Sequence, residues 1–238
     1  MGLIRPNMFS HYGTKGVVIG KKDQGESDRV LITYTEEFGK LKLFGKSIRK
    51  ESSKLRSGSE PFALLELEFV EGRWRKTLTD VRVIDSYPRT NSDLERIALA
   101  GMIADDLDGL IGGEERDPKV WELVQSSFNL IEAGKGLFAY HRFFWNLLSI
   151  LGYGPEIYHC SQCRGGLDPS ELLFSPEDGG LVCASCRPKD SAFSVNERTI
   201  KVIRVLLRDD GLFEKLRLNP VDEGLLWDTS RRYLSVIQ

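Results

Sequence analysis

The four cysteines of this chain lie in one short window and have the spacing of a metal site. Cys160 and Cys163 form one C-x2-C pair, and Cys183 and Cys186 form a second pair after 19 intervening residues. A two-residue spacer lets both sulfurs of a pair reach one ion, and two pairs complete a tetrahedral shell. Two Gly-Gly pairs between them favour the tight turns of a zinc ribbon. The sequence therefore predicts one Zn2+ bound by these four thiolates.

Three other roles for the cysteines fit the sequence less well. Disulfides need an oxidising compartment, and the N-terminal residues lack the pattern of a secretory signal peptide. A redox-active pair usually occurs singly, beside a parallel-sheet pattern. A catalytic zinc needs an open coordination position, which four cysteines do not leave. His159 is close enough in sequence to replace a thiolate, but we expect it to be structural or simply exposed. The zinc is thus predicted to stabilise the fold.

Charge is distributed unevenly along the 238 residues. The net charge is −2, but residues 1–90 hold 17 Lys and Arg against 12 Asp and Glu, and the remainder holds 16 against 23. A basic N-terminal part predicts an anionic partner such as nucleic acid, and the acidic remainder predicts a different partner. No apolar run approaches the roughly 18 residues of a membrane helix. We therefore expect a cytoplasmic protein.

Residues 15–86 show the period-two alternation of β-strands. Alternating apolar and polar residues, separated by glycine or charged turns, predict strands at 15–22, 27–36, 40–46, 61–70 and 73–85. Five short strands fit a small closed barrel such as the OB-fold, which binds oligonucleotides. We predict an OB-fold domain over residues 1–87.

After Tyr87 the pattern changes to the period of helices. Helices are expected to begin at a capping box of Ser92 and Glu95, at Asp117-Pro118, at Leu137, at a capping box of Ser194 and Glu197, and at Asn219-Pro220. The zinc module, predicted at 156–190, interrupts a helical domain of residues 88–155 and 191–238. Bound zinc would hold the third and fourth helices together. The predicted fold class is a multidomain α+β chain.

One segment partly matches a catalytic motif. Residues 39–47 resemble a nucleotide-binding P-loop, but five residues separate the glycines where the motif has four, and the intervening Lys-Leu-Lys-Leu alternates as a strand. A nucleotide-dependent enzyme is therefore not expected. HExxH and GxSxG motifs do not occur. Asp105, Asp106 and Asp108 are expected on the solvent-exposed face of a helix rather than in a cation site. We predict a protein that is not an enzyme.

Basic residues concentrate in the third strand and the segment after it. The predicted DNA contacts there are Lys42, Lys46, Arg49, Lys50, Lys54 and Arg56. OB-folds bind oligonucleotides on strands 2–3 and nearby loops, and Lys and Arg neutralise phosphates whatever the base sequence. The alternative is a solvated strand face and a flexible loop. A second predicted cluster is Arg73, Arg75 and Lys76, around Trp74, which either stacks on a base or belongs to the barrel core.

Several short motifs occur in a characteristic order. They are Gly25-Glu-Ser-Asp-Arg29 with Thr35-Glu-Glu-Phe-Gly-Lys40, then Gly45-Lys-Ser-Ile-Arg-Lys50 with Ser53-Lys-Leu55, then Arg142-Phe143 and Leu151-Gly-Tyr-Gly-Pro155 before the first cysteine pair. Together with the order of barrel, helices and inserted zinc module, they resemble the RecO family of bacterial recombination mediators. One departure is Arg164, which follows Cys163 where relatives often have glycine. Some relatives lack the cysteines, which agrees with a structural zinc.

The resemblance implies a protein that binds single- and double-stranded DNA and anneals complementary strands. It also implies help in loading the RecA recombinase onto strands coated by single-stranded-DNA-binding protein (SSB), together with RecR. For this chain it implies DNA contacts at the six basic residues of segment 42–56, and a contact between Arg142 and the SSB tail carboxylate, unless Arg142 is an ordinary surface residue. A bacterial, nucleoid-associated location follows. The alternative is a zinc-stabilised protein-interaction module in which the helical half is the working surface.

Overall fold

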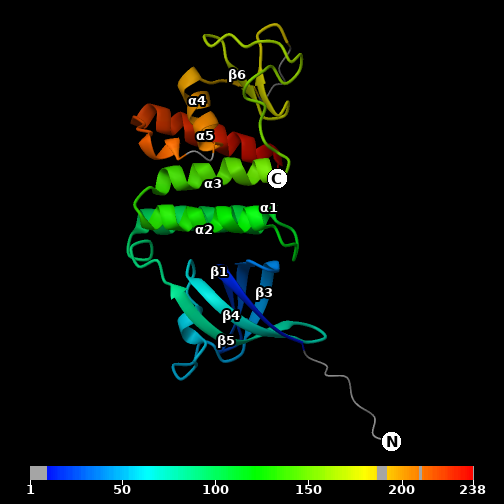
Figure 1. Cartoon of the computed structure of the whole chain (residues 1–238), viewed down its shortest axis with the longest axis vertical. Helices are drawn as coiled ribbons and strands as arrows, with labels where there is room; N and C mark the ends of the chain where they lie inside the picture. Colours follow the sequence, from blue (N-terminus) through cyan, green and yellow to red (C-terminus); the bar gives the residue numbers. More distant parts are fainter. Residues whose placement is uncertain (1–9, 187–191, 209–210, 238) are drawn as a thin grey trace, which may run out of the picture. The chain divides into compact units, whose positions relative to one another are not determined.

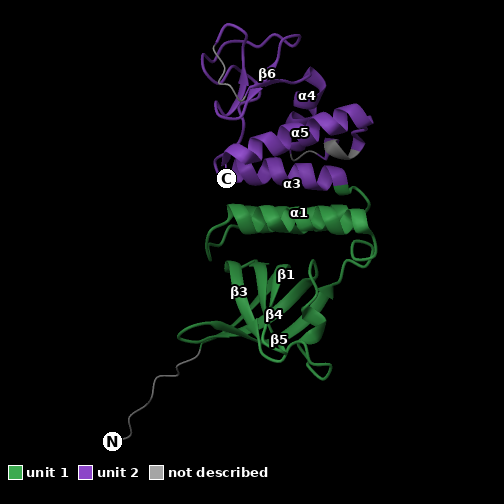
Figure 2. Ribbon diagram, turned by 180° about the vertical axis from the view of Figure 1, so that it is seen from behind, with its two compact units in different colours: residues 1–136 green, residues 137–238 purple. Residues whose placement is uncertain are grey.

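The computed structural model describes residues 10–186, 192–208 and 211–237, and it contains two compact units (Figure 1). Unit 1 comprises residues 1–136, and unit 2 comprises residues 137–238 (Figure 2). Unit 1 holds a β-barrel and two helices, and unit 2 holds the remaining helices and the four cysteines. The predicted α+β class is confirmed.

Five strands form the barrel of unit 1. They are β1 (Ser10–Gln24), β2 (Asp28–Thr35), β3 (Gly39–Gly45), β4 (Leu64–Glu71) and β5 (Lys76–Asp85). The order β1-β2-β3-β5-β4 returns to β1, because β1 pairs antiparallel with both β2 and β4. β3 and β5 are parallel and meet in a short seam, where Leu43 pairs with Lys76 and Phe44 with Thr77. This five-stranded topology agrees with the predicted OB-fold.

Alternation along the strands fills the barrel with apolar side chains. Leu31, Leu41, Leu43 and Leu67 are fully buried in one cluster. Ile48, which lies after β3 and outside the strands, is fully buried in the same cluster. The connection between β3 and β4 is therefore anchored to the core.

Two helices of unit 1, α1 (Leu94–Leu110) and α2 (Pro118–Glu132), lie side by side next to the barrel (Figure 1). Asp117 caps α2 as predicted. The predicted capping box at α1 is wrong, because Asp93 is the N-cap and accepts from the backbone N–H groups of Glu95 and Arg96. The Ser92 hydroxyl instead donates to the backbone oxygen of Arg89.

Ion pairs join the barrel to α1 and to the segment between α1 and α2. The Lys40 ammonium lies 3.0 Å from a carboxylate oxygen of Asp108, and Lys76 lies 2.7 Å from Glu114. Of the three aspartates expected on the wet face of α1, Asp105 and Asp108 are exposed, whereas Asp106 is buried. The barrel and the helix pair therefore form one packed body within unit 1.

Unit 2 combines three helices with a small sheet. Its elements are α3 (Gly136–Ile150), β6 (Leu173–Ser175), β7 (Gly180–Val182), β8 (Phe193–Ser194), α4 (Glu197–Leu206), the 3-10 turn η2 (Leu212–Lys215) and α5 (Pro220–Ile237). The strands pair in the order β7-β6-β8. Asn219 caps α5 as predicted. The predicted cap at Ser194 is wrong, because Ser194 belongs to β8 and Asn196 accepts from the Thr199 N–H.

The predicted domain boundaries remain predictions. The compact units divide at residue 136, after α2, rather than at residue 87, and the predicted end of the zinc module falls at 187–191, outside the described residues. Among the helices that the structure describes, none has the length and apolar character needed to cross a membrane.

Candidate metal centre and nucleic-acid interface

The four cysteines converge in space as their spacing predicts. Their sulfurs all lie within 4.8 Å of one another. The Cys160 and Cys186 sulfurs are 3.8 Å apart, as are those of Cys163 and Cys183. Zinc about 2.3 Å from four tetrahedral sulfurs places them about 3.8 Å apart, whereas a disulfide bond is about 2.05 Å long. The geometry fits a four-thiolate zinc site and does not fit disulfides.

The surroundings of the sulfurs also suit a bound cation. The Cys183 N–H donates to the Cys160 sulfur, and the Gly165 N–H donates to the Cys163 sulfur. Burial raises the pKa of Cys160, but hydrogen bonds from backbone N–H groups outweigh it and lower that pKa to about 6. Hydrogen bonds with neighbouring thiols raise the pKa of Cys186 to about 12. The opposite pKa shifts show that neighbouring thiols share protons when no cation is bound. A bound Zn2+ would remove this interaction, because metal-bound thiols are deprotonated.

His159 stays outside this cluster. Its side chain is exposed, and its backbone N–H donates to the Glu156 carboxylate. Four sulfurs fill a tetrahedral shell and leave no position for a substrate. The arrangement therefore has the form of a structural site.

The zinc module is attached to the helices around it. The Arg204 Nε of α4 donates to the backbone oxygen of Ile157 at 3.1 Å, and the Tyr233 hydroxyl of α5 donates to the backbone oxygen of Tyr153, just before the module, at 2.9 Å. Phe174 of β6 packs edge-on against Tyr233 and against Trp145 of α3. The four-cysteine module therefore packs its apolar side chains against α3 and α5 and is hydrogen-bonded to α4.

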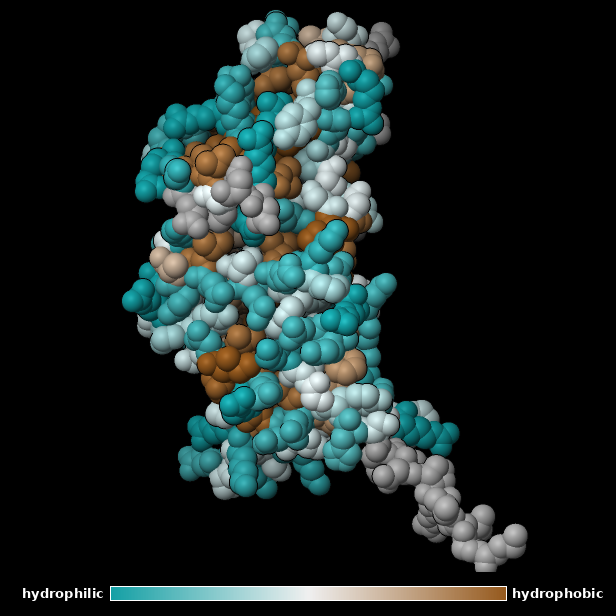
Figure 3. Space-filling view, viewed as in Figure 1, coloured by the Kyte–Doolittle hydropathy of each residue, from teal (hydrophilic) through white to brown (hydrophobic). Residues whose placement is uncertain are grey.

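The six basic residues predicted on and after β3 are all exposed. Five of them, Lys42, Lys46, Lys50, Lys54 and Arg56, have no carboxylate within ion-pair distance in the described part of the chain. Arg49 differs, because its guanidinium lies 3.5 Å from Asp23, which also binds Arg29. Figure 3 shows much of the viewed face of the barrel covered by hydrophilic side chains. The segment from Lys42 to Arg56 therefore carries positive charge that ion pairs within the described residues do not balance.

The basic residues after β3 lie in a series of hydrogen-bonded turns. The Arg49 N–H donates to the backbone oxygen of Ser27, and further turns run from Ser47 to Lys50, from Lys50 to Ser53 and from Ser53 to Arg56. A 3-10 turn, η1 (Arg56–Gly58), follows. The buried Ile48 side chain fixes this segment on the barrel.

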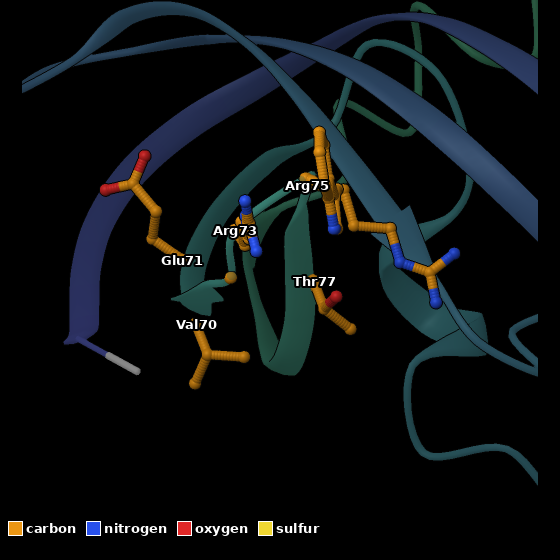
Figure 4. A pocket seen from close by; sticks show the side chains of 7 residues that line it. Val70, Glu71, Arg73, Arg75 and Thr77 are labelled. Atoms are coloured by element: carbon orange, nitrogen blue, oxygen red, sulfur yellow. The ribbon is translucent and has the colours of Figure 1, made fainter. Parts of the chain in front are cut away.

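The second predicted cluster lies in the turn between β4 and β5. Trp74 is 86% exposed, so its alternative assignment to the barrel core is wrong. The Arg73 guanidinium lies 4.9 Å from the centre of the Trp74 ring, and Arg75 lies 3.7 Å from the centre of the Phe44 ring. Figure 4 shows Arg75 and Glu71 extending in opposite directions from this hairpin.

Lys76 is the exception among the predicted cations. Its side chain is 15% exposed and binds Glu71 at 3.0 Å and Glu114 at 2.7 Å. Burial lowers the pKa of Lys76, but the two carboxylates outweigh it and raise that pKa. Lys76 therefore carries a charge that the protein itself balances.

Two further sequence predictions concern α3 and the P-loop-like segment. Arg142 is half-buried on α3, and its backbone oxygen accepts from the Asn146 side chain. The neighbouring His141 is fully buried, and burial lowers its pKa to about 3. Residues 39–45 form β3, whose backbone pairs with β2. The P-loop interpretation is therefore rejected, because these amides are not arranged around a phosphate.

Comparisons with known proteins match nearly the whole chain. Residues 8–87 match the family described as Recombination protein O N terminal, and residues 91–236 match Recombination protein O C terminal. The DNA repair protein RecO of Desulfitobacterium hafniense is 30% identical over 209 residues, covering 86% of this chain and 76% of the relative. The DNA repair protein RecO of Dehalococcoides mccartyi is 28% identical over 209 residues, covering 87% and 81%. That of a Roseiflexus species is 28% identical over 226 residues, covering 94% and 80%.

The five-stranded barrel lies within the N-terminal family match, and the helices with the four-cysteine cluster lie within the C-terminal match, so the chain is of the class of recombination proteins. The chain belongs to the RecO family. Its role therefore lies in DNA repair and recombination.

Proposed function

We propose that this chain is a recombination mediator that binds single- and double-stranded DNA through its barrel and anneals complementary strands. It helps to load the RecA recombinase onto single strands coated by SSB. The observation that carries the proposal is a group of five exposed cations on and after β3 that lack carboxylate partners among the described residues: Lys42, Lys46, Lys50, Lys54 and Arg56. OB-folds bind oligonucleotides on this side of the barrel.

The proposed mechanism is physical rather than chemical. Annealing requires two phosphate backbones to approach each other, and their repulsion opposes this step. Lys and Arg side chains displace condensed counterions and lower the repulsion without reading the sequence. The chain acts without breaking a covalent bond, so it is proposed not to be an enzyme.

The remaining parts of the chain have supporting roles in this proposal. Cys160, Cys163, Cys183 and Cys186 would hold one Zn2+, which supplies folding stability to unit 2. Arg142 is proposed to meet the SSB tail carboxylate, and RecR is the proposed co-mediator. These partners are proposed from the resemblance to the family, and we propose that the chain works with the bacterial chromosome in the cytoplasm, as a role in DNA repair requires.

Charge reversal of the anchored turns tests the proposal. The variant Lys46→Glu, Lys50→Glu, Lys54→Glu leaves the ion pair of Arg49 with Asp23 intact. We expect weaker binding to single- and double-stranded DNA and slower annealing of SSB-coated strands. Because each single-strand phosphate contact contributes about 0.7 to the slope of log K against log salt, the slope should fall by about 2. Titrations at several salt concentrations measure both quantities.

A matched control separates location from net charge. Lys119→Glu, Arg208→Glu, Arg231→Glu changes the net charge equally, at exposed positions outside the barrel. It should leave DNA affinity and salt slope nearly unchanged. Loss of binding in the control, with the barrel variant unaffected, would overturn the proposal and favour the helical half as the working surface.

A further inference from the structure

We infer that the β4–β5 turn is a base-stacking subsite that selects single-stranded over double-stranded DNA. This inference deepens the proposed function and rests on it. Its centre is Trp74, whose 86% exposure leaves a large aromatic surface in contact with solvent. Large aromatic side chains are mostly buried unless a partner covers them.

The turn holds Trp74 between two anchored arginines. The Gly72 N–H donates to the backbone oxygen of Arg75 at 3.0 Å and closes the turn. Arg73 lies over the Trp74 ring, and Arg75 lies over the Phe44 ring of β3. Such cation–π contacts position the guanidinium groups while leaving their charge available to an anion. The turn therefore presents an open indole flanked by two positive charges.

A row of uncharged side chains lies across the strands below this turn. Val30 pairs with Phe44, Phe44 with Thr77, and Thr77 with Val70, so the row crosses β2, β3, β5 and β4. Directly opposite residues share one face of a sheet. Leu43, next to Phe44, faces the core, so this row lies on the opposite face of the sheet, where Val30, Val70 and Thr77 are half-buried and Phe44 is covered by Arg75. Residues 70–75 and Thr77 line an open pocket of about 860 Å³ (Figure 4).

The charges around the row complete the argument for a nucleic acid. Lys42 lies two residues from Phe44 on the same face of β3, and Lys46 follows the strand. Glu71 is the one carboxylate that lines the pocket, and Lys76 binds it. Aromatic and apolar surface bounded by unbalanced cations is complementary to a strand with phosphates and free base faces. In a duplex those faces are covered by neighbouring base pairs, so Trp74 can add affinity for single strands only.

Two substitutions in the full chain test the subsite. Trp74→Ala should weaken binding of an oligo-dT strand about 5- to 150-fold, the range of stacking on one base, and leave duplex affinity and the salt slope unchanged. Trp74→Phe keeps an aromatic ring and should retain most of the single-strand affinity. Trp74 is on the surface, and far-UV circular dichroism checks that both variants retain the fold.

An abasic strand of equal length measures how much the bases contribute to the binding affinity. It carries the same phosphates as oligo-dT, so it should bind the wild type about as weakly as oligo-dT binds Trp74→Ala. Fluorescence gives an independent readout, because Trp121 and Trp145 are buried and Trp227 is half-buried against Tyr140 and His141 in unit 2. Oligo-dT should quench the wild type strongly, and this quenching should be lost in Trp74→Ala and absent with the abasic strand.

Three results would overturn the subsite. They are equal binding of oligo-dT and the abasic strand, equal loss of single-strand and duplex binding in Trp74→Ala, and quenching by an acidic SSB-tail peptide but not by oligo-dT. The last result would assign the turn to a protein partner. Failure of the proposed function is distinguishable, because the Lys46/Lys50/Lys54 reversal would then leave DNA binding intact. If that reversal weakens binding while Trp74→Ala does not weaken oligo-dT binding, the subsite alone is refuted.

Discussion

At the scale of single residues, two glycines share a backbone conformation but differ in surroundings. Gly25 has φ 60° and Gly39 has φ 63°, values that L side chains adopt at a cost. A Cβ at Gly25 would meet nothing within 4 Å, whereas a Cβ at Gly39 would lie 2.2 Å from the backbone oxygen of Glu115. Gly39 is therefore where the β2–β3 turn touches the segment between α1 and α2.

Alanine at each glycine separates the two effects. Gly25→Ala should lower the free energy of unfolding by about 1 kcal/mol, from backbone strain alone. Gly39→Ala should cost about 1–3 kcal/mol more, because backbone must move to admit the methyl group. Urea unfolding of the full chain, followed by circular dichroism, measures both. Equal losses of unfolding free energy in the two variants would show that the close approach of Gly39 to Glu115 does not add to the cost of the substitution.

At the scale of elements, the last residue of α2 holds the link between the barrel and α1. The Glu132 carboxylate accepts from the backbone N–H groups of Arg89 at 3.0 Å and Thr90 at 2.8 Å, and from the Thr90 hydroxyl at 2.9 Å. The Arg96 guanidinium donates to the backbone oxygen of Glu132. Burial raises the pKa of Glu132, but the hydrogen bonds from Thr90 and Arg89 outweigh it and lower that pKa.

Glu132→Ala should therefore destabilise unit 1 by about 1–2 kcal/mol at neutral pH, because three donors lose a charged acceptor. A lowered carboxyl pKa gives stability that is present above the unfolded pKa of about 4.3 and is lost as pH falls through the folded pKa. The difference from wild type should accordingly shrink in acid. Glu122→Ala, at an exposed position on the same helix, is the control. A pH-independent difference would contradict this role.

Local patterns predicted which elements form but not all of their ends. Ser92 and Asp93 are both good N-caps, and only the folded backbone shows that Asp93 is used. Leu94 fits the apolar period of α1 yet is 86% exposed at the first turn. The strand pattern likewise continued through residues 73–75, although these residues form a turn.

The same limit applies to the candidate sites. The cysteine quartet was predictable because ligand spacing is local and the ion imposes one geometry. The exposure of Trp74 and the pairing of Lys76 with Glu114 were not, because both depend on tertiary contacts. For Lys76 the partner carboxylate lies 38 residues away in the sequence. The number of Lys and Arg residues in a sequence segment therefore overestimates the positive charge that is available to bind DNA.

At the scale of the whole molecule, the two candidate sites belong to different compact units. The four cysteines lie in unit 2, and the predicted DNA contacts on the barrel lie in unit 1. Chelation of zinc, or Cys160→Ser, should lower the thermal unfolding temperature of unit 2. Oligo-dT affinity should change by no more than about twofold, because the cysteines and the predicted DNA contacts belong to separate compact units and share no partners.

Calorimetry with a DNA titration measures both effects, and metal analysis should give one zinc per chain. Ser185→Ala, at an exposed position between two ligands, is the control. Equal loss of unit 2 stability and DNA affinity after chelation would show that the units are coupled.

The parallel seam between β3 and β5 makes one edge of the barrel weaker than the others. Only Leu43–Lys76 and Phe44–Thr77 pair there, and closing it brings together distant segments at a cost in loop entropy. Transient opening of the native barrel should therefore begin at this seam, with fast exchange of its amide hydrogens. Arg75 over Phe44 bridges the same gap. A strand of DNA bound across the seam would bind the closed barrel only. Binding would therefore shift the equilibrium toward the closed barrel and reduce its transient opening.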